Sequence, residues 1–282
     1  MQASDTAVWT WKLARSGEFK LDAGSMMGII PKAVWSRTLE TDEAGRMVLQ
    51  QNSVLLERDG KKIVIEVGIG GKFGTKERGI YDLSERTIED AVTEAGWDPA
   101  EVDTVILTHL HFDHAGGLTK QDGDGNPVLT FPNAEIVCQA REWEDAIANR
   151  STMHKTYLKD HLTEGVANKL RLIDGEAEVE PGITAWPVPG HTWGQQAVRW
   201  VDETGRTVVF VPDVMPTRHH VSPSACMSYD VESWTSQQER IKLLRTASEA
   251  RWVLVLVHDA DRAIYTVRES ADRPGRYELE AV

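Results

Sequence analysis

The stretch that decides the fold is Thr104–Gly117, TVILTHLHFDHAGG, where a short apolar run leads into three histidines and one aspartate. Imidazole nitrogen and carboxylate oxygen are ligands that Zn²⁺ accepts at about 2.0 Å. Alternate residues of an extended chain point to one side, so His109 and His111 can hold one ion. Asp113 and His114 follow the strand and can reach a second ion. Unrelated histidines would not explain the residue types and the spacing together, so the stretch predicts a divalent-metal site.

Three later apolar runs also lead to one candidate metal ligand each. They are ITAWPVPGHTWG with His191, TVVFVPD with Asp213 and RWVLVLVHD with His258. Each run has the β-branched or apolar composition of a buried strand. Open α/β sheets gather ligands at the carboxyl ends of their strands, so segments far apart in sequence can converge on one crevice. With the first stretch, the sequence offers seven candidate ligands.

The order of these motifs resembles the metallo-β-lactamase-fold hydrolase superfamily. The pattern is His-x-His-x-Asp-His, then PGHTxG, then a strand ending in Asp and a strand ending in His, and it extends from about Ser53 to Asp259. The resemblance implies the α/β fold class, as a four-layer αββα sandwich. It also implies two Zn²⁺ ions, the first on His109, His111 and His191, the second on Asp113, His114 and His258, with Asp213 and a hydroxide bridging them. Iron, manganese or cobalt can replace zinc at such mixed ligands.

The chain length fits one large domain. Its 282 residues show no internal repeat and no linker rich in Ser, Gly or Pro. We therefore expect a single metallo-β-lactamase-like domain over residues 1–282, with residues about 1–40 as an N-terminal extension packed on it. Asp59-Gly60 fits a tight turn with positive φ and predicts a hairpin over Ser53–Val67.

Helix signals occur at three places. A box-like Asp-x-x-Glu at Asp82 predicts a helix that ends at Gly96. Residues about 139–165 and the segment from Glu232 to Glu249 are also expected to be helical. Strands and helices thus alternate along the chain, as they do in layered α/β proteins.

Composition limits the partners. The net charge is −13 with a sequence pI near 5.2, and no block of Lys or Arg offers a phosphate-binding face, so we expect no nucleic-acid partner. No stretch approaches the roughly 20 apolar residues of a membrane span, and the charged first thirty residues lack the apolar core of a secretory signal. We expect a cytoplasmic protein without membrane contact. Cys138 and Cys226 give no disulfide framework, and the choice between monomer and homodimer stays open.

The expected chemistry follows from two dications about 3.5 to 4 Å apart, which lower the pKa of a bridging water toward neutrality. The resulting hydroxide is expected to attack a lactone or ester carbonyl. Asp113 or Asp213 would orient this hydroxide and take its proton. Glu66 matches a position where many members of the family carry an Asp behind the metal-binding histidines, so its longer side chain is expected to reach them differently.

Departures from two branches of the family narrow the reaction. The commonest zinc β-lactamases have a Cys ligand and no bridging Asp, and flavin-linked di-iron members have Glu in place of the second His; this chain shows neither pattern. LDAGSMMGIIPK (residues 21–32) and THLHFDHAGG look most like the quorum-quenching lactonase and organophosphate hydrolase branch. Many lactonases place Tyr three residues after the bridging Asp, where this chain has Pro216. Tyr229 is the alternative hydroxyl, with His219 and His220 as further candidates to assist catalysis.

Apolar side chains in irregular segments near the motifs are candidates for the substrate wall. They are Met26, Met27, Ile29, Trp35, Phe73, Trp193 and Met215. Methionine-rich walls adapt to varied ligands. The alternative for these residues is that they only pack in the hydrophobic core. The same alternative applies to Tyr229.

Several functions stay open from the sequence. The leading hypothesis is a dinuclear zinc hydrolase acting on a small-molecule lactone or ester. A glyoxalase-II-like thioesterase or an organophosphate hydrolase would share these ligands. A metal-stabilised binding protein without turnover would need a fully coordinated site, whereas catalytic zinc keeps an open position. A persulfide dioxygenase with one iron is a minor alternative that one ion per chain would favour.

Overall fold

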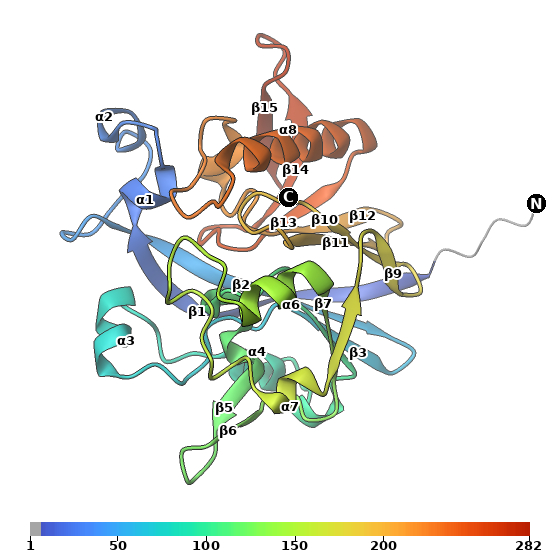
Figure 1. Cartoon of the computed structure of the whole chain (residues 1–282). Helices are drawn as coiled ribbons and strands as arrows, with labels where there is room; N and C mark the ends of the chain where they lie inside the picture. The colour runs from blue at the N-terminus through green and yellow to red at the C-terminus, as the bar shows by residue number, and fades with distance from the viewer. Residues whose placement is uncertain (1–6) are drawn as a thin grey trace, which may run out of the picture.

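Two β-sheets packed face to face form the centre of the computed structural model, which describes residues 7–282 (Figure 1). The strands of the first sheet, in their spatial order, are β1 (Val8–Asp22), β2 (Arg46–Arg58), β3 (Lys61–Ile65), β4 (Thr104–Ile106), β7 (Glu135–Gln139) and β8 (Leu170–Ile173). From β3 to β8 neighbouring strands run parallel, so their carboxyl ends meet at one edge of the sheet.

The second sheet contains the strands of the carboxyl-terminal half of the chain. They are β9 (Ala177–Glu180), β10 (Ile183–Pro187), β11 (Gln196–Asp202), β12 (Thr207–Val211), β13 (Val253–Leu256), β14 (Ile264–Glu269) and β15 (Tyr277–Ala281). β12 and β13 are parallel neighbours at the middle of this sheet, and the other pairs are antiparallel. The ends of β12 and β13 therefore lie next to each other.

Strand β1 joins the two sheets. Val8 and Trp9 pair in parallel with β11, and the rest of β1 pairs with β2 in antiparallel register. A strand with hydrogen-bonded partners in both sheets is an internal part of the fold. Within the predicted N-terminal extension of residues about 1–40, residues 8–22 thus form β1, and residues 1–6 lie outside the described residues.

The space between the sheets is filled by apolar side chains from both inner faces. Val54 and Ile65 of the first sheet and Val198 and Phe210 of the second are fully buried there, together with Trp9. Burial of one such side chain contributes about 1.5–3 kcal/mol to folding. This inner layer fixes the sheets against each other and holds the ends of their strands at a constant separation.

Helices cover the two outer faces (Figure 1). α4 (Ile88–Glu94) and α6 (Ala140–Ile147) pack on the first sheet through residues such as Val92 and Ala146. α8 (Ser233–Ala250) packs on the second sheet through Leu243, Leu244 and Ala247. The α/β fold class and the four-layer αββα sandwich predicted from the sequence are confirmed.

Short elements complete the chain. They are α1 (Ala23–Met27), α2 (Lys32–Trp35), α3 (Thr75–Tyr81), α5 (Phe112–Ala115), α7 (Glu164–Ala167), the 3-10 turns η1 (Pro99–Glu101), η2 (Gly116–Leu118) and η3 (Arg218–Val221), and the hairpin β5 (Thr119–Gln121) with β6 (Pro127–Leu129). Within residues 7–282, no helix combines the length and the apolar character that crossing a bilayer requires.

Two local predictions are confirmed. Asp59 and Gly60 have φ values of 51° and 81°, as the tight turn between β2 and β3 requires. The helix predicted from Glu232 to Glu249 is α8. Both signals act over neighbouring residues and need no tertiary contact.

Two helix predictions are wrong in extent. Asp82 does not open a helix: it ends α3 with φ 45°, and α4 begins at Ile88 behind a capping box of Thr87 and Asp90. Within residues about 139–165, α6 extends only from Ala140 to Ile147, and irregular chain follows until α7 begins at Glu164. In that irregular part the backbone is held by tertiary contacts, which the local sequence does not display.

Candidate metal centre and cleft

The structure brings all seven candidate ligands together between the ends of strands. They come from the loop after β4 with α5, and from the loops after β10, β12 and β13. Each of these side chains is at least nine-tenths buried. They are His109, His111, Asp113, His114, His191, Asp213 and His258.

Within this cluster the potential ligand atoms form three overlapping groups. The atoms of each group lie within 4.8 Å of one another. The groups are His109, His111 and His191; His109, His114 and Asp213; and Asp113, His114 and His258. The first and the third contain the same residues as the two ligand sets that the family resemblance implies, and Asp213 lies between them.

Asp213 faces both halves of the cluster. Its Oδ2 lies 3.2 Å from His191 Nε2, and its Oδ1 lies 3.3 Å from His258 Nε2. A carboxylate with one oxygen toward each histidine has the geometry of a ligand shared by two ions. Burial works against a charge on Asp213, but the surrounding imidazoles of His258, His114 and His191 keep the pKa of this carboxyl below its ordinary value.

The hydrogen bonds of the cluster leave acceptor atoms facing one another. His258 Nδ1 donates to the Gln50 carbonyl at 2.9 Å, so Nε2 of the neutral ring carries a lone pair. That nitrogen lies 3.3 Å from Asp213 Oδ1 and 3.5 Å from Asp113 Oδ2. Buried His109 Nε2 has no hydrogen-bond partner within the described chain. Acceptors this close repel each other unless a cation or a proton lies between them, so the donor set fits a divalent metal.

Protonation of the cluster is uneven. Burial opposes a charge on His114, yet the carboxylates of Asp113, Glu66 and Asp213 together raise the pKa of His114 well above its ordinary value. Burial and the neighbouring imidazoles lower the pKa of His109 well below that value. The cluster thus attracts positive charge at the point where several carboxylates meet, and a metal ion must compete there with a proton.

Carboxylates behind the histidines hold their rings. His114 Nδ1 lies 2.5 Å from Glu66 Oε2, and His191 Nδ1 lies 3.0 Å from Asp230 Oδ1. The expectation that Glu66 lies behind the histidines is confirmed; its φ of +66° is unusual for a residue with a side chain. Such partners fix the tautomer and orientation of a metal-binding imidazole.

Sequence reasoning missed two of the buried acids, Asp230 and Glu142. Glu142 accepts hydrogen bonds from Leu110 N and from Thr192 Oγ1, which belong to two different ligand loops. The histidines themselves were the available signal, because each needs a partner for its second nitrogen. The sequence does not say which of 44 acidic residues supplies it.

The two glycines that end the first motif are required by close packing. A Cβ on Gly117 would lie 2.1 Å from the Val67 carbonyl oxygen, and one on Gly116 would lie 2.3 Å from that of Ile69. The chain after β3 therefore passes directly against the chain after α5. Val67 N also donates to the His114 carbonyl at 3.1 Å, which fixes the ligand segment to the sheet.

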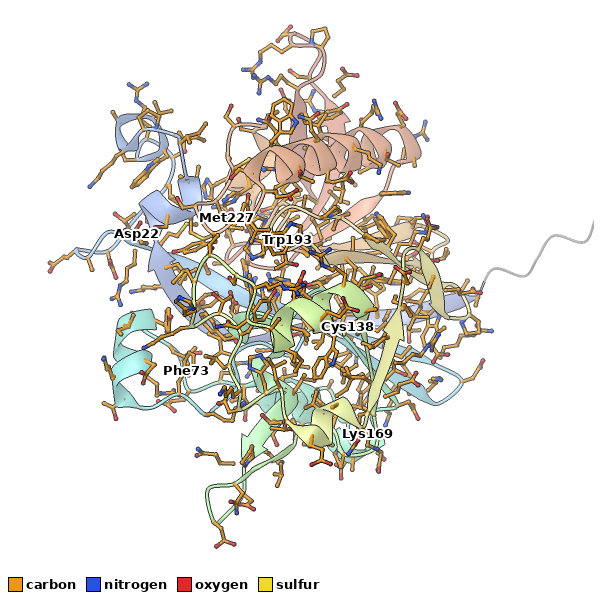
Figure 2. The ribbon with its side chains drawn as sticks, viewed as in Figure 1. Asp22, Phe73, Cys138, Lys169, Trp193 and Met227 are labelled. Carbon is orange, nitrogen blue, oxygen red and sulfur yellow. The ribbon has the colours of Figure 1, made fainter. Side chains whose placement is uncertain are left out.

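A cleft leads from the surface to the cluster. Among its lining residues are five of the candidate ligands, namely His111, Asp113, His191, Asp213 and His258. Apolar side chains form much of the rest: Leu21, Met26, Phe112, Met153 and Met227. Met227 lies next to α1, since Ser228 N donates to the Ser25 carbonyl at 2.8 Å (Figure 2). An apolar cleft that ends at clustered polar ligands is the usual form of a small-molecule site.

The structure separates the other predicted catalytic residues. Tyr229 lines the cleft, and burial raises the pKa of its hydroxyl. His220 does not line it: its Nδ1 lies 2.9 Å from Thr217 Oγ1, and its Nε2 lies 2.9 Å from the Met26 carbonyl oxygen. Both ring nitrogens of His220 are thus engaged inside the protein and outside the cleft, and the catalytic role of His220 stays a prediction. His219 lines a different depression.

Only one of the predicted wall residues, Met26, lines the cleft. Met27, Trp35 and Met215 are buried in the core, and Ile29 is 83% exposed. The last two are placed beside other side chains. Phe73 lies beside α3 (Figure 2) and stacks on Tyr81, the last residue of that helix. Trp193 donates to Glu232, and Arg141 lies over its ring. Met153 and Met227, which the sequence did not single out, take the expected place of a methionine-rich wall.

Comparison with known sequences places the chain among metallo-hydrolases. The family model described as the metallo-beta-lactamase superfamily matches residues 46–248, more than half of the chain. An N-acyl homoserine lactonase of Bacillus thuringiensis is 25% identical over 221 residues, which cover 74% of this chain and 80% of that protein. A probable metallo-hydrolase of Mycobacterium tuberculosis is 25% identical over 279 residues, covering 84% and 85% of the two chains.

Solved structures agree with this placement. A probable metal-dependent hydrolase from Staphylococcus aureus is similar with a TM-score of 0.86 and 26% identity, over 99% of both chains. The dizinc quorum-quenching lactonase AidC has a TM-score of 0.78 over 99% of both chains, and at 17% identity it shows the shared fold alone. With the family match and the clustered histidines and aspartates at the strand ends, these likenesses show that the chain belongs to the metallo-beta-lactamase superfamily, as a metallo-hydrolase related to its lactonases.

Proposed function

We propose that this protein is a dinuclear zinc hydrolase that opens lactones or related esters. The observation that carries the proposal is the position of Asp213, whose two carboxylate oxygens face His191 and His258 at the inner end of an apolar cleft. A shared carboxylate between two groups of buried ligands is what two neighbouring divalent ions require. The shared strand β1 supports the further proposal that the whole chain works as one domain.

The proposed ligands divide into two sets around Asp213. The first set is His109, His111 and His191, and the second is Asp113, His114 and His258. Two bound zinc ions would supply Lewis acidity toward a carbonyl oxygen and would make hydroxide available at neutral pH. Iron, manganese or cobalt would suit the same mixture of imidazole and carboxylate.

The side chains at the inner end of the cleft have separate roles in this proposal. Asp213, whose carboxyl stays ionised, and Asp113 can orient the attacking water and accept its proton. A tyrosine hydroxyl is protonated at neutral pH, and burial raises the pKa of Tyr229 further, so its hydroxyl can donate a hydrogen bond to an oxygen of the substrate. Tyr229 would thus supply the hydroxyl that Pro216 cannot.

The cleft favours a substrate with an apolar part. Leu21, Met26, Met153 and Met227 offer flexible apolar contacts along the path to the ligands. The Bacillus thuringiensis relative at 25% identity is named an N-acyl homoserine lactonase, and the substrate in that name joins an acyl chain to a lactone. We therefore propose N-acyl homoserine lactones as the substrate class, with simple lactones and aryl esters as weaker substrates.

A substrate panel tests this function. The purified protein is analysed for metal per chain and then assayed with acyl homoserine lactones of increasing chain length, an aryl ester, S-lactoylglutathione and paraoxon, by acid release or absorbance. We expect two ions per chain and fastest opening of a lactone. Faster hydrolysis of S-lactoylglutathione would replace the proposal with a thioesterase, and faster hydrolysis of paraoxon with an organophosphate hydrolase. Two bound ions without any turnover would indicate a binding protein.

A further inference from the structure

The carboxylate of Glu142 is fully buried behind the metal-binding loops. Its Oε1 accepts hydrogen bonds from Leu110 N at 2.9 Å and from Tyr157 Oη at 3.0 Å, and its Oε2 accepts one from Thr192 Oγ1 at 2.6 Å. Glu142 is 0% exposed and does not line the cleft. It therefore acts through its neighbours and has no contact with a substrate.

Two of these neighbours belong to the loops that carry the first ligand set. Leu110 stands between His109 and His111, and Thr192 directly follows His191. One carboxylate thus links the loop after β4 to the loop after β10. These loops are far apart in sequence, since His111 and His191 are separated by 80 residues. The link is direct, since each oxygen of Glu142 holds one loop.

Close packing presses the second loop onto α6. A Cβ on Gly194, in the segment PGHTWG, would lie 2.3 Å from Glu142 N and 2.5 Å from Glu142 Cα. A glycine at this position lets the loop approach the first turn of the helix. This approach brings Thr192 within hydrogen-bond distance of the carboxylate.

The backbone carbonyl of Leu110 also has a hydrogen-bond partner. His161 Nε2 lies 3.1 Å from the Leu110 carbonyl oxygen, and His161 is fully buried. Burial lowers the pKa of His161 to about 4, so the ring is neutral at pH 7 and its Nε2–H donates this bond. The residue between the two histidines of the first motif is therefore fixed at both its N–H and its carbonyl.

The charge of Glu142 has no basic partner in residues 7–282. Arg141, the preceding residue of α6, pairs with Asp145 at 2.6 Å, and Arg150 pairs with Asp145 at 3.1 Å. Burial raises the pKa of Glu142, while its three hydrogen bonds and the neighbouring His191 favour the ionised form. A cation held by the first ligand set, whose loops Glu142 contacts through Leu110 and Thr192, would stabilise the ionised form of this buried carboxyl group.

We propose that Glu142 is a positioning residue for the first metal position, where it sets the separation of the His109–His111 loop from the His191 loop and favours a cation between them. This inference rests on the proposed metal centre, because it assigns a role to Glu142 at that centre. It predicts an effect on the first ion alone, since no hydrogen bond of Glu142 reaches the segment of Asp113 and His114 or the loop of His258.

Three variants separate the parts of this role. Glu142→Gln keeps the shape and removes the charge, and Thr192→Val removes only the hydroxyl that links the carboxylate to the His191 loop. Tyr157→Phe is the matched control, because it removes a hydrogen bond to the same carboxylate oxygen without releasing either ligand loop. Zinc affinity is measured by competition with a chromophoric chelator, and the folding of each metal-free variant is checked by its Tm.

The two positions are resolved by second substitutions. In a His258→Ala background the first ligand set remains complete, and in a His191→Ala background the second set remains complete. We expect Glu142→Gln and Thr192→Val to weaken zinc binding about 10- to 100-fold in the His258→Ala background and less than about threefold in the His191→Ala background. Tyr157→Phe should change neither by more than about threefold.

Other outcomes overturn the proposal. Unchanged zinc affinity in both backgrounds would show that Glu142 has only a structural role, whatever happens to the Tm. Equal weakening in both backgrounds, or an equal effect of Tyr157→Phe, would show a general loss of order. Zinc affinity is measured without lactone turnover. A protein that binds two zinc ions but hydrolyses no lactone would refute the proposed function, and the zinc affinities of the variants would still test the role of Glu142.

Discussion

The two halves of the candidate metal centre are supported in different ways. The candidate ligands of the first half are all imidazoles, on His109, His111 and His191, and carboxylates from other segments, Asp230 and Glu142, hold the His191 ring and the loops. In the other half, Asp113 brings its own negative charge, Glu66 holds His114, and a backbone carbonyl holds His258. In the first half, the side chains behind the candidate ligands, Asp230 and Glu142, supply the carboxylate groups and also fix the positions of the ligands. The second carries much of its charge among the ligands themselves.

The largest effect is expected where the halves meet. Asp213→Asn removes the charge that both halves share, so we expect kcat/KM for a lactone to fall by about 10³-fold or more, with fewer than two zinc ions per chain. Hydrolysis rates and elemental analysis on the same sample measure both quantities. Asp261→Asn, an exposed acid of the loop after β13, is the control and should leave both unchanged. Full activity in Asp213→Asn would show that the two halves of the centre do not share the Asp213 carboxylate.

Acid should destabilise the support of the first half. The pKa of His161 is about 4 in the folded protein, below its ordinary value of 6.5, so the unfolded chain binds the extra proton between these pH values. The free energy of unfolding should therefore fall as the pH drops from 6.5 to 4, by up to about 3 kcal/mol for this group. Urea unfolding of the metal-free protein at several pH values measures it. His161→Gln should reduce the change in the free energy of unfolding between pH 6.5 and 4. An unchanged pH dependence in this variant would show that His161 is not its cause.

A substitution behind the second half should act on the other ion. Glu66→Gln removes the charge that holds His114 Nδ1, and we expect zinc binding to the second ligand set to weaken by about 10- to 100-fold. The first set, measured in the His258→Ala background, should keep its affinity. If Glu66→Gln and Glu142→Gln weakened the same ion, the division of the centre into two separately supported halves would be wrong.

A smaller effect is expected at Asp230. Its carboxylate fixes only the ring of His191, so Asp230→Asn should weaken zinc binding at the first position by about tenfold. The same competition titration measures this change. Asp230→Ala should bind zinc more weakly than Asp230→Asn, because the Asn side chain can still accept a hydrogen bond from His191 Nδ1–H. The reverse order of zinc affinities would argue against a role through that hydrogen bond.

The last effect, also about tenfold, is expected in the cleft and outside the candidate ligands. Tyr229→Phe should lower kcat for a lactone by about tenfold and leave two zinc ions per chain, since the hydroxyl lies among the cleft residues and outside the ligand groups. Steady-state kinetics and elemental analysis on one preparation measure the two quantities. Loss of metal in Tyr229→Phe would move this residue from the cleft to the support of the centre.

The ligand segments could be predicted because their signal is local. An apolar strand followed by one histidine or aspartate is readable in a few residues, and the carboxyl ends of such strands meet wherever a sheet forms. The structure accordingly brings His191, Asp213 and His258 to the cluster begun by His109. The hairpin turn at Asp59-Gly60 was predictable for the same reason, because the two residues themselves carry the required φ.

Other residues could not be placed in this way. His220 stands close to Asp213 in sequence, yet it turns inward to Thr217 and the Met26 carbonyl. Met153 and Met227 line the cleft, whereas Met27 and Met215 are in the core, and nothing in their immediate neighbours distinguishes them. Their places depend on which segment packs against them.

The sequence by itself determined the kind of site, its candidate ligands and their order along the chain, since chemistry and strand periodicity are both written in short stretches. Only the tertiary structure decided which acids stand behind those ligands, which side chains line the cleft, and that β1 is shared by both sheets. The physical reason is distance along the chain. Glu142 meets Leu110 and Thr192 across 32 and 50 residues, and such meetings are settled by the packing of whole sheets and helices.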